Sequence, residues 1–220
     1  MCQAAPQVEV MPSPLSVGHY FTSAVYTAEK PEFLKDVRAV ASEYIDHVKA
    51  NEKLDEIYPV RMTHDIRTDP RMVEFCRFVG EQSWHILFGQ GYKMQQLSTV
   101  FESIWCQEHH KHSLMEQHTH TNPVQIVGFY FLDCPEKCST VVFHDPRAGK
   151  VQASLPENDL NIISPASNNI GFYPKEGQFF FTNAWLAHSF SRHASDLPIR
   201  FIHFNLEVQP TVMPSQVEIV

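Results

Sequence analysis

The sequence predicts an α+β fold in which helices come first and a β-sandwich or jelly roll follows. A helical period of apolar residues is present from Pro31 to about Gly91 and disappears after that point. Six short β-like runs, separated by Pro, Gly, Asn and Asp, occupy the rest of the chain. Helices followed by strands are typical of α+β proteins, and many short strands favour a sandwich or jelly roll.

The length of 220 residues, of which 43% are hydrophobic, predicts a single domain with one well-filled core. We expect an extended arm at residues 1–17, a mainly helical supporting part at 18–98, a jelly-roll core at 99–208 and a tail at 209–220. The arm is rich in proline and has no apolar period, and we expect an edge strand through residues 18–21.

Two amphipathic helices are expected in the supporting part. After Pro31, apolar residues recur at i, i+3 and i+4 between Phe33 and Val48, and the proline stands near the first turn. A second apolar series follows Asp69 and Pro70 and ends near Gly89 or Gly91. Each helix has one apolar face, so both are expected to cover a sheet.

The strands are expected at residues 100–106, 124–132, 140–144, 169–173, 178–182 and 199–208. The longest connection between them spans residues 148–168 and contains polar residues and two prolines. Loops of this length are often functional, so this segment is a candidate lid over a binding site.

Three histidines are candidate metal ligands. His118 and His120 flank one residue, and side chains two positions apart share a face only on an extended strand, so the pair predicts a strand that continues into the apolar run 124–132. His188 ends a similar run that starts at Gln178, so two strands would bring three imidazoles together. The alternative is a set of hydrogen-bonded core histidines. The spacing alone is a weak signal, because His110 and His112 have the same spacing and are expected to lie in a solvated turn.

Arg200 opens the last strong strand. A permanently charged guanidinium that points into a barrel requires an anionic partner, and its fork matches the geometry of a ligand carboxylate. The alternative is an internal salt bridge with Asp or Glu.

Net charge, apolar runs and cysteine spacing limit the substrate classes and the cellular location that we expect. The formal net charge of −8 disfavours binding to a nucleic-acid backbone, so we expect a small-molecule or protein side-chain substrate. The start of the chain has no signal-peptide pattern and no apolar run approaches about 20 residues, so we expect a cytoplasmic protein without membrane contact. Five irregularly spaced cysteines favour reduced thiols. The sequence does not specify the oligomeric state.

Several motifs follow the histidine pair in a recognisable order. They are Val-Gly-Phe-Tyr-Phe-Leu at 127–132, Asp-Pro-Arg at 145–147, Tyr-Pro-Lys-Glu-Gly at 173–177, Phe-Thr-Asn-Ala-Trp-Leu-Ala-His at 181–188, Arg200 and Asn205. In this order they resemble the iron(II)- and 2-oxoglutarate-dependent oxygenases, and in particular a group found in bacteria and phages. The resemblance covers roughly residues 100–208.

This resemblance implies a double-stranded β-helix, the jelly-roll barrel of these enzymes, with helices packed on one outer face. It makes His118 and His188 ligands of Fe(II) and Arg200 the partner of the distal carboxylate of 2-oxoglutarate. Asn205 and Tyr130 are further cosubstrate contacts, although a core tyrosine bonded to backbone is the alternative for Tyr130. The implied reaction converts 2-oxoglutarate to succinate and CO2 while an unidentified substrate is hydroxylated.

The chain departs from the family pattern at position 120, where most members have Asp or Glu and this sequence has His120. Three neutral imidazoles leave the ion with its full double charge and also suit zinc or copper. Glu116 or Asp145 is the alternative third ligand.

Two other functions stay open at this point. One is a cupin-type three-histidine dioxygenase that does not use 2-oxoglutarate, although the glutamate expected in such proteins is absent from residues 121–125. The other is a non-enzymatic jelly-roll module that binds a structural metal.

Overall fold

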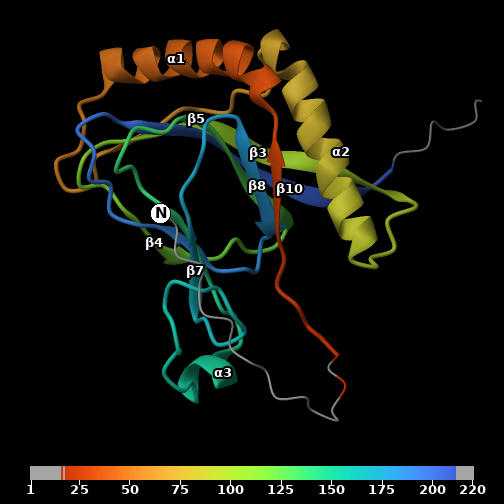
Figure 1. Ribbon diagram of the computed structural model, residues 1–220. Coiled ribbons are helices and arrows are strands. Elements are labelled where there is room, and N and C mark those ends of the chain that lie inside the picture. Colours follow the sequence, from red (N-terminus) through yellow and green to blue (C-terminus); the bar gives the residue numbers. More distant parts are fainter. Residues whose placement is uncertain (1–15, 17, 212–220) are drawn as a thin grey trace, which may run out of the picture.

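The computed structural model describes residues 16 and 18–211, which fold into two antiparallel sheets that face each other. The larger sheet has the strand order β1-β8-β5-β10-β3-β2, and the smaller sheet has the order β4-β9-β6-β7. Helices α1 and α2 lie along the outer side of the larger sheet (Figure 1). The predicted α+β jelly roll with N-terminal helices is confirmed.

The bounds of the strands agree well with the apolar runs. The larger sheet contains β1 Val25–Glu29, β2 Val60–Met62, β3 Leu97–His109, β5 Val124–Asp133, β8 Gln178–Asn183 and β10 Ile199–Pro210. The smaller sheet contains β4 Met115–His118, β6 Val141–His144, β7 Asn169–Phe172 and β9 His188–Phe190. Most consecutive strands from β3 onward change sheet, which closes the jelly roll.

The two predicted helices begin as the sequence indicates. Helix α1, Leu34–Asn51, follows a 3-10 turn that starts at Pro31, and α2, Val73–Gly89, follows a second such turn that starts at Pro70. The Asp69 carboxylate accepts the backbone N–H of Arg71 at 2.9 Å and so caps the entry to α2. A short helix α3, Ala148–Gln152, lies in the segment predicted as a long loop.

Two apolar clusters lie on opposite sides of the larger sheet. The helix-side cluster contains Ile45 and Phe75 from the helices, and the inner cluster between the sheets contains Phe129 and Phe190. Strand β10 contributes to both: Ile202 and its alternate neighbours face the helices, and residues at odd positions face the barrel. This alternation decides which side chains can reach the site.

Several expectations about strands are corrected. The edge strand is β1, Val25–Glu29, and not residues 18–21, because the alternating sequence Val-Tyr-Thr-Ala-Glu supplies the pairing with β8. The histidine pair does not run on into β5, since β4 ends at His118 and lies in the other sheet. His188 begins β9 after a turn and does not end β8.

Two strands of the larger sheet, β1 and β2, lie in the part that was expected to be mainly helical. The predicted arm at 1–17, except residue 16, and the tail from 212 lie outside the described residues. Among the described helices, none has the length and apolar character needed to cross a membrane.

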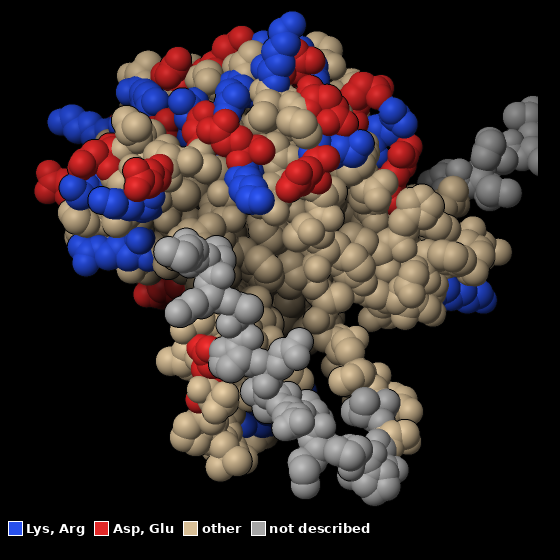
Figure 2. Space-filling view, in the orientation of Figure 1, with Lys and Arg blue, Asp and Glu red and all other residues tan. Residues whose placement is uncertain are grey.

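Charged side chains of both signs are interspersed over the helical side of the face shown in Figure 2. Many of them form ion pairs, such as Arg71 with Glu43 at 2.7 Å between the start of α2 and helix α1. Positive charge is therefore not gathered into one basic patch on this face.

Candidate metal centre

Three histidines converge at one end of the smaller sheet. His118 ends β4 and pairs directly with His188, the first residue of β9. His120 lies two residues beyond β4, and its backbone N–H donates to the carbonyl of Ala184 at 2.9 Å, which fixes the turn. The candidate ligand atoms of the three residues all lie within 4.8 Å of one another. Their ring centroids are 4.5–5.3 Å apart.

The hydrogen bonds of two rings define which nitrogen is free. Nδ1 of His118 lies 2.8 Å from the carbonyl oxygen of Glu116, and Nδ1 of His188 lies 3.1 Å from that of Leu186. A carbonyl only accepts, so Nδ1 carries the proton in both rings and Nε2 keeps its lone pair. Backbone carbonyls orient metal-binding histidines in this way.

The free nitrogens fit a metal ion. Nε2 of His188 and Nε2 of His120 are buried and have no hydrogen-bond partner. A buried polar atom without a partner destabilises the fold by about 1–3 kcal/mol, so its presence in a native site requires an explanation. A divalent ion bound by the three nitrogens satisfies them and leaves coordination positions open.

Burial keeps two of the imidazoles, those of His188 and His120, neutral. The pKa of His188 is lowered to about 3, chiefly by desolvation; the Leu186 carbonyl acts in the opposite direction, and the neighbouring histidines add to the lowering. Desolvation, assisted by His118, lowers the pKa of His120 to about 4. Neutral imidazoles bind a metal without first losing a proton.

The structure brings neither alternative carboxylate to the histidines. Among the described residues, the metal-competent group contains only the three histidines, and Glu116 is exposed. Asp145 binds the guanidinium of Arg147 at 2.9 and 2.8 Å and accepts its backbone N–H, which lowers the pKa of Asp145 to about 2. The Asp-Pro-Arg motif therefore closes a turn.

Arg200 lies on the opposite face of β10 from the histidines, so its expected position inside the barrel is corrected. Its Nε is 2.9 Å from Oδ2 of Asp133, and its Nη1 donates to Oγ of Ser42 on α1 at 3.0 Å. The Nε–H is not aligned as a hydrogen bond, so the attraction to Asp133 is chiefly coulombic. The alternative of an internal salt bridge describes this residue.

Tyr130 also faces the helices, in contrast to the expectation. Its ring packs in the helix-side cluster against Phe75, and its hydroxyl donates to the carbonyl of Lys30 at 2.8 Å. The parity argument that linked Tyr130 to His118 failed because a turn separates β4 from β5 and the two strands lie in different sheets. A core tyrosine bonded to backbone, the alternative, describes it.

Asn205 does face the barrel interior, together with two residues that the sequence analysis did not select. His203 stacks on Trp105 with ring centroids 4.2 Å apart and lies 5.3 Å from the ring of His120. The signal was present in the sequence: Arg200 and Asn205 are five positions apart, so one strand places them on opposite faces, whereas His203 shares the face of Asn205.

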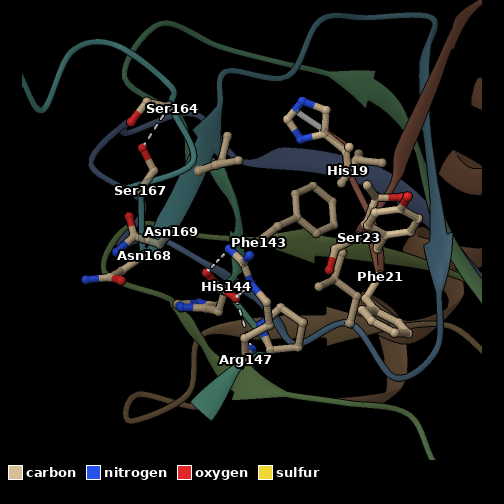
Figure 3. Close-up of a pocket in the computed structure, with 18 residues that line it drawn as sticks. His19, Phe21, Ser23, Phe143, His144, Arg147, Ser164, Ser167, Asn168 and Asn169 are labelled. Atoms are coloured by element: carbon tan, nitrogen blue, oxygen red, sulfur yellow. Dashed lines mark hydrogen bonds and ion pairs between the residues drawn. The ribbon is translucent and has the colours of Figure 1, made fainter. Parts of the chain in front are cut away.

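A cavity of about 410 Å³ opens beside β6, and none of the three candidate metal ligands lines it. Figure 3 shows His19 and Phe21 on one side of it, Ser164 and Ser167 on the other, and Phe143 between them. The ring of Phe143, which lines the cavity, lies 6.4 Å from that of His188, so this wall is near the candidate metal centre. The guanidinium of Arg147 in its wall is neutralised by Asp145, so the lining is chiefly neutral and polar.

Residues 103–205 match the family described as "Putative 2OG-Fe(II) oxygenase". This segment contains all three histidines and most of the strands of both sheets. The resemblance read from the sequence motifs is confirmed. No match was found among curated proteins.

Solved structures show the same fold. AviO1 from Streptomyces viridochromogenes Tue57 has a TM-score of 0.60 and 11% identity, over 87% of this chain and 92% of that chain. A prolyl-4-hydroxylase from Pseudomonas putida has a TM-score of 0.55 and 6% identity, over 84% and 94%. HygX from Streptomyces hygroscopicus, solved with nickel, 2-oxoglutarate and hygromycin B, has a TM-score of 0.55 and 10% identity, over 87% and 85%. At these identities the likeness establishes the fold alone.

Proposed function

We propose that this protein is an Fe(II)- and 2-oxoglutarate-dependent oxygenase whose metal is held by His118, His120 and His188. The observation that carries the proposal is the convergence of three imidazoles with free Nε2 atoms on a jelly roll that matches this oxygenase family. The reaction is hydroxylation: a substrate C–H, 2-oxoglutarate and O2 give the alcohol, succinate and CO2. One oxygen atom enters the alcohol and the other enters succinate.

Each side chain has a defined task in this proposal. Bound Fe(II) supplies the redox chemistry that couples oxidation of the 2-oxo acid to oxidation of the substrate. Backbone carbonyls hold the rings of His118 and His188 in the orientation that presents Nε2. The rings of Phe129 and Phe143 lie 5.4 and 6.4 Å from His188 and exclude water from one side of the centre.

The cavity beside β6 is the proposed substrate site. It offers hydroxyl, amide and imidazole groups together with the Phe143 ring, which suits a neutral polar small molecule or an uncharged protein side chain. Residues 164–170 contribute to its wall, so the segment 148–168 is positioned to act as a lid. Limited proteolysis with and without 2-oxoglutarate tests this role, and unchanged cleavage within the segment would count against a lid.

A second candidate is a three-histidine oxygenase that does not use 2-oxoglutarate. The observation that favours it is the position of Arg200, which is the only Lys or Arg on strands β3 to β10 and faces away from the centre. No strand therefore presents a cation to a cosubstrate carboxylate inside the barrel.

Anaerobic titration separates these candidates from each other and from a non-enzymatic metal-binding module. Protein loaded with Fe(II) is titrated with 2-oxoglutarate while the visible charge-transfer band of the chelated 2-oxo acid is followed, with His188→Ala as the comparison. The proposal predicts a band in the wild type and none in the variant. Bound metal without a band contradicts the use of 2-oxoglutarate.

A further inference from the structure

The barrel interior contains neutral polar atoms where a cationic anchor was expected. Inward positions of β10 hold Phe201, His203 and Asn205, and the positions of β3 that pair with the last two hold Trp105 and Ser103. None of these side chains carries a permanent charge. Recognition of an anionic ligand inside this barrel therefore has to depend on neutral groups and on the metal.

His203 is the most unusual of them. It is 1% exposed, and its Nδ1 has no hydrogen-bond partner. Its ring is fixed by the stack on Trp105 and by the edge of Phe129, whose centroid lies 4.8 Å away. A fixed, neutral imidazole with an unused nitrogen beside His120 is a preformed site for one hydrogen bond.

Two further unpartnered atoms lie in the same part of the barrel. Nε1 of Trp105 is buried without a partner, and an indole nitrogen can only donate. Oδ1 of Asn205 is also unpartnered, while Nδ2 of Asn205 donates to Oγ of Ser103 at 3.2 Å and to the carboxylate of the exposed Glu102 at 3.5 Å. Several polar atoms without hydrogen-bond partners lie together near the candidate metal centre. A bound ligand explains them better than a set of separate packing defects.

Charge balance identifies the class of ligand. Three neutral imidazoles leave a divalent ion with two uncompensated positive charges, and the ion is then the largest charge in the site. A dianion neutralises it, and a cationic side chain beside the dianion would restore an excess of positive charge. Neutral donors orient the dianion without this excess, and hydrogen bonds to charged groups each contribute about 1.5–3 kcal/mol.

We propose that Trp105 and His203 form a neutral anchor for the metal-distal carboxylate of 2-oxoglutarate, the role that the family resemblance implied for Arg200. The inference rests on the proposed function, because it assumes that a 2-oxo dicarboxylate binds at the metal. Arg200 then acts only in the attachment of α1 to the larger sheet.

The test measures binding and not turnover. Protein loaded with Ni(II) is titrated calorimetrically with 2-oxoglutarate and with 2-oxobutyrate, a 2-oxo acid that lacks the distal carboxylate. The wild type is expected to prefer 2-oxoglutarate by about tenfold or more, equivalent to at least one charge-assisted hydrogen bond. Trp105→Phe, which keeps the ring and removes the N–H, and His203→Gln are each expected to reduce this preference and to leave the affinity for 2-oxobutyrate unchanged.

Arg200→Gln is the matched control, and nickel content and thermal unfolding establish that each variant is folded and loaded. The inference predicts that this variant keeps the full preference. An intact preference in both Trp105→Phe and His203→Gln, or its loss in Arg200→Gln, overturns the inference and leaves the proposed function standing. Absence of 2-oxoglutarate binding to nickel-loaded wild type overturns both.

Discussion

The two faces of strand β10 differ in whether their polar groups are matched by an opposite charge. On the helix side, Arg200 belongs to a network of opposite charges, in which Glu108 lies 3.1 Å from Lys49 and Asp133 lies 3.0 Å from Arg38. Nε of Arg200 and Oδ2 of Asp133 make no aligned hydrogen bond, but each has an opposite charge beside it. On the barrel side, His203 and Asn205 have polar atoms without partners. The matched face attaches helices to the sheet, and the unmatched face is prepared for a ligand. Neutral polar atoms that have neither a hydrogen-bond partner nor an opposite charge nearby therefore distinguish the barrel side from the helix side.

The largest effect is expected on the unmatched side, at the metal ligands. Replacement of His188 by Ala removes one of three nitrogens and is expected to lower metal affinity by about 100-fold or more, since even partners of metal ligands contribute 10–100-fold. Metal content after dialysis is the measurement. His47→Ala, an exposed histidine on α1, is the control. Equal metal content in both variants would place the metal elsewhere.

On the matched side, Glu108 should be the most sensitive residue. Its side chain is fully buried and lies within 4 Å of Lys49, Arg61, His110 and Arg200, so Glu108→Gln leaves several cations without their anion. We expect a loss of about 3 kcal/mol in the free energy of unfolding, as for other broken buried ion pairs. Urea denaturation measures this loss. Metal content of the folded variant should be unchanged, and a fall in it would remove the functional distinction between the two faces.

Tyr130→Phe gives a smaller effect and separates the two interpretations of this residue. The substitution removes the hydrogen bond to the Lys30 carbonyl and should reduce the free energy of unfolding by about 1 kcal/mol. Because the hydroxyl faces the helices, binding of 2-oxoglutarate to the nickel-loaded protein should not change. Weaker binding of 2-oxoglutarate without a loss of stability would indicate that Tyr130 contacts the cosubstrate.

The smallest effect is expected at Asp145, and it depends on pH. The Arg147 ion pair lowers the pKa of Asp145 in the folded state to about 2, from 3.8. A carboxylate whose pKa is lowered in the folded state stabilises the fold at pH values above its pKa in the unfolded state. Asp145→Asn should therefore reduce the free energy of unfolding by about 1 kcal/mol near neutral pH, a small value because Arg147 is half exposed.

That difference between wild type and Asp145→Asn should diminish as the pH falls from about 4 to about 2. Denaturation at several pH values measures it, and the metal content of wild type and Asp145→Asn should be equal at neutral pH. If Asp145→Asn loses its metal at neutral pH, the turn has a role in the centre after all.

The elements of the fold were readable because they depend on local periodicity. The apolar stripe after Pro31 and the Asp69-Pro70 entry define α1 and α2, and the long apolar run 199–208 corresponds to β10. Short strands such as β9 and β2 were missed because three residues are too few for a period to emerge. Their positions are fixed by pairing with distant strands.

The sequence also predicted that the three histidines come together, whereas it did not indicate the inferred cosubstrate contacts. Convergence of His118 and His188 follows from their positions at strand ends, and His120 reaches them through a backbone hydrogen bond that no spacing rule reveals. Which face Tyr130 occupies depends on a turn and on the change of sheet between β4 and β5. For Arg200, the order of the motifs indicated cosubstrate binding. Arg200 and Asn205 are five positions apart on one strand and so face opposite sides, and this alternation predicted the position of Arg200 correctly.

The most direct test of the proposed function is the formation of succinate. Fe(II)-loaded wild type and His188→Ala, matched in protein concentration, are mixed with 2-oxoglutarate and air, and succinate is quantified in both. We expect succinate from the wild type in excess of the variant, because only the wild type keeps all three of the nitrogens that would hold the iron. Wild type that retains one iron per chain and yields no more succinate than His188→Ala would contradict the account.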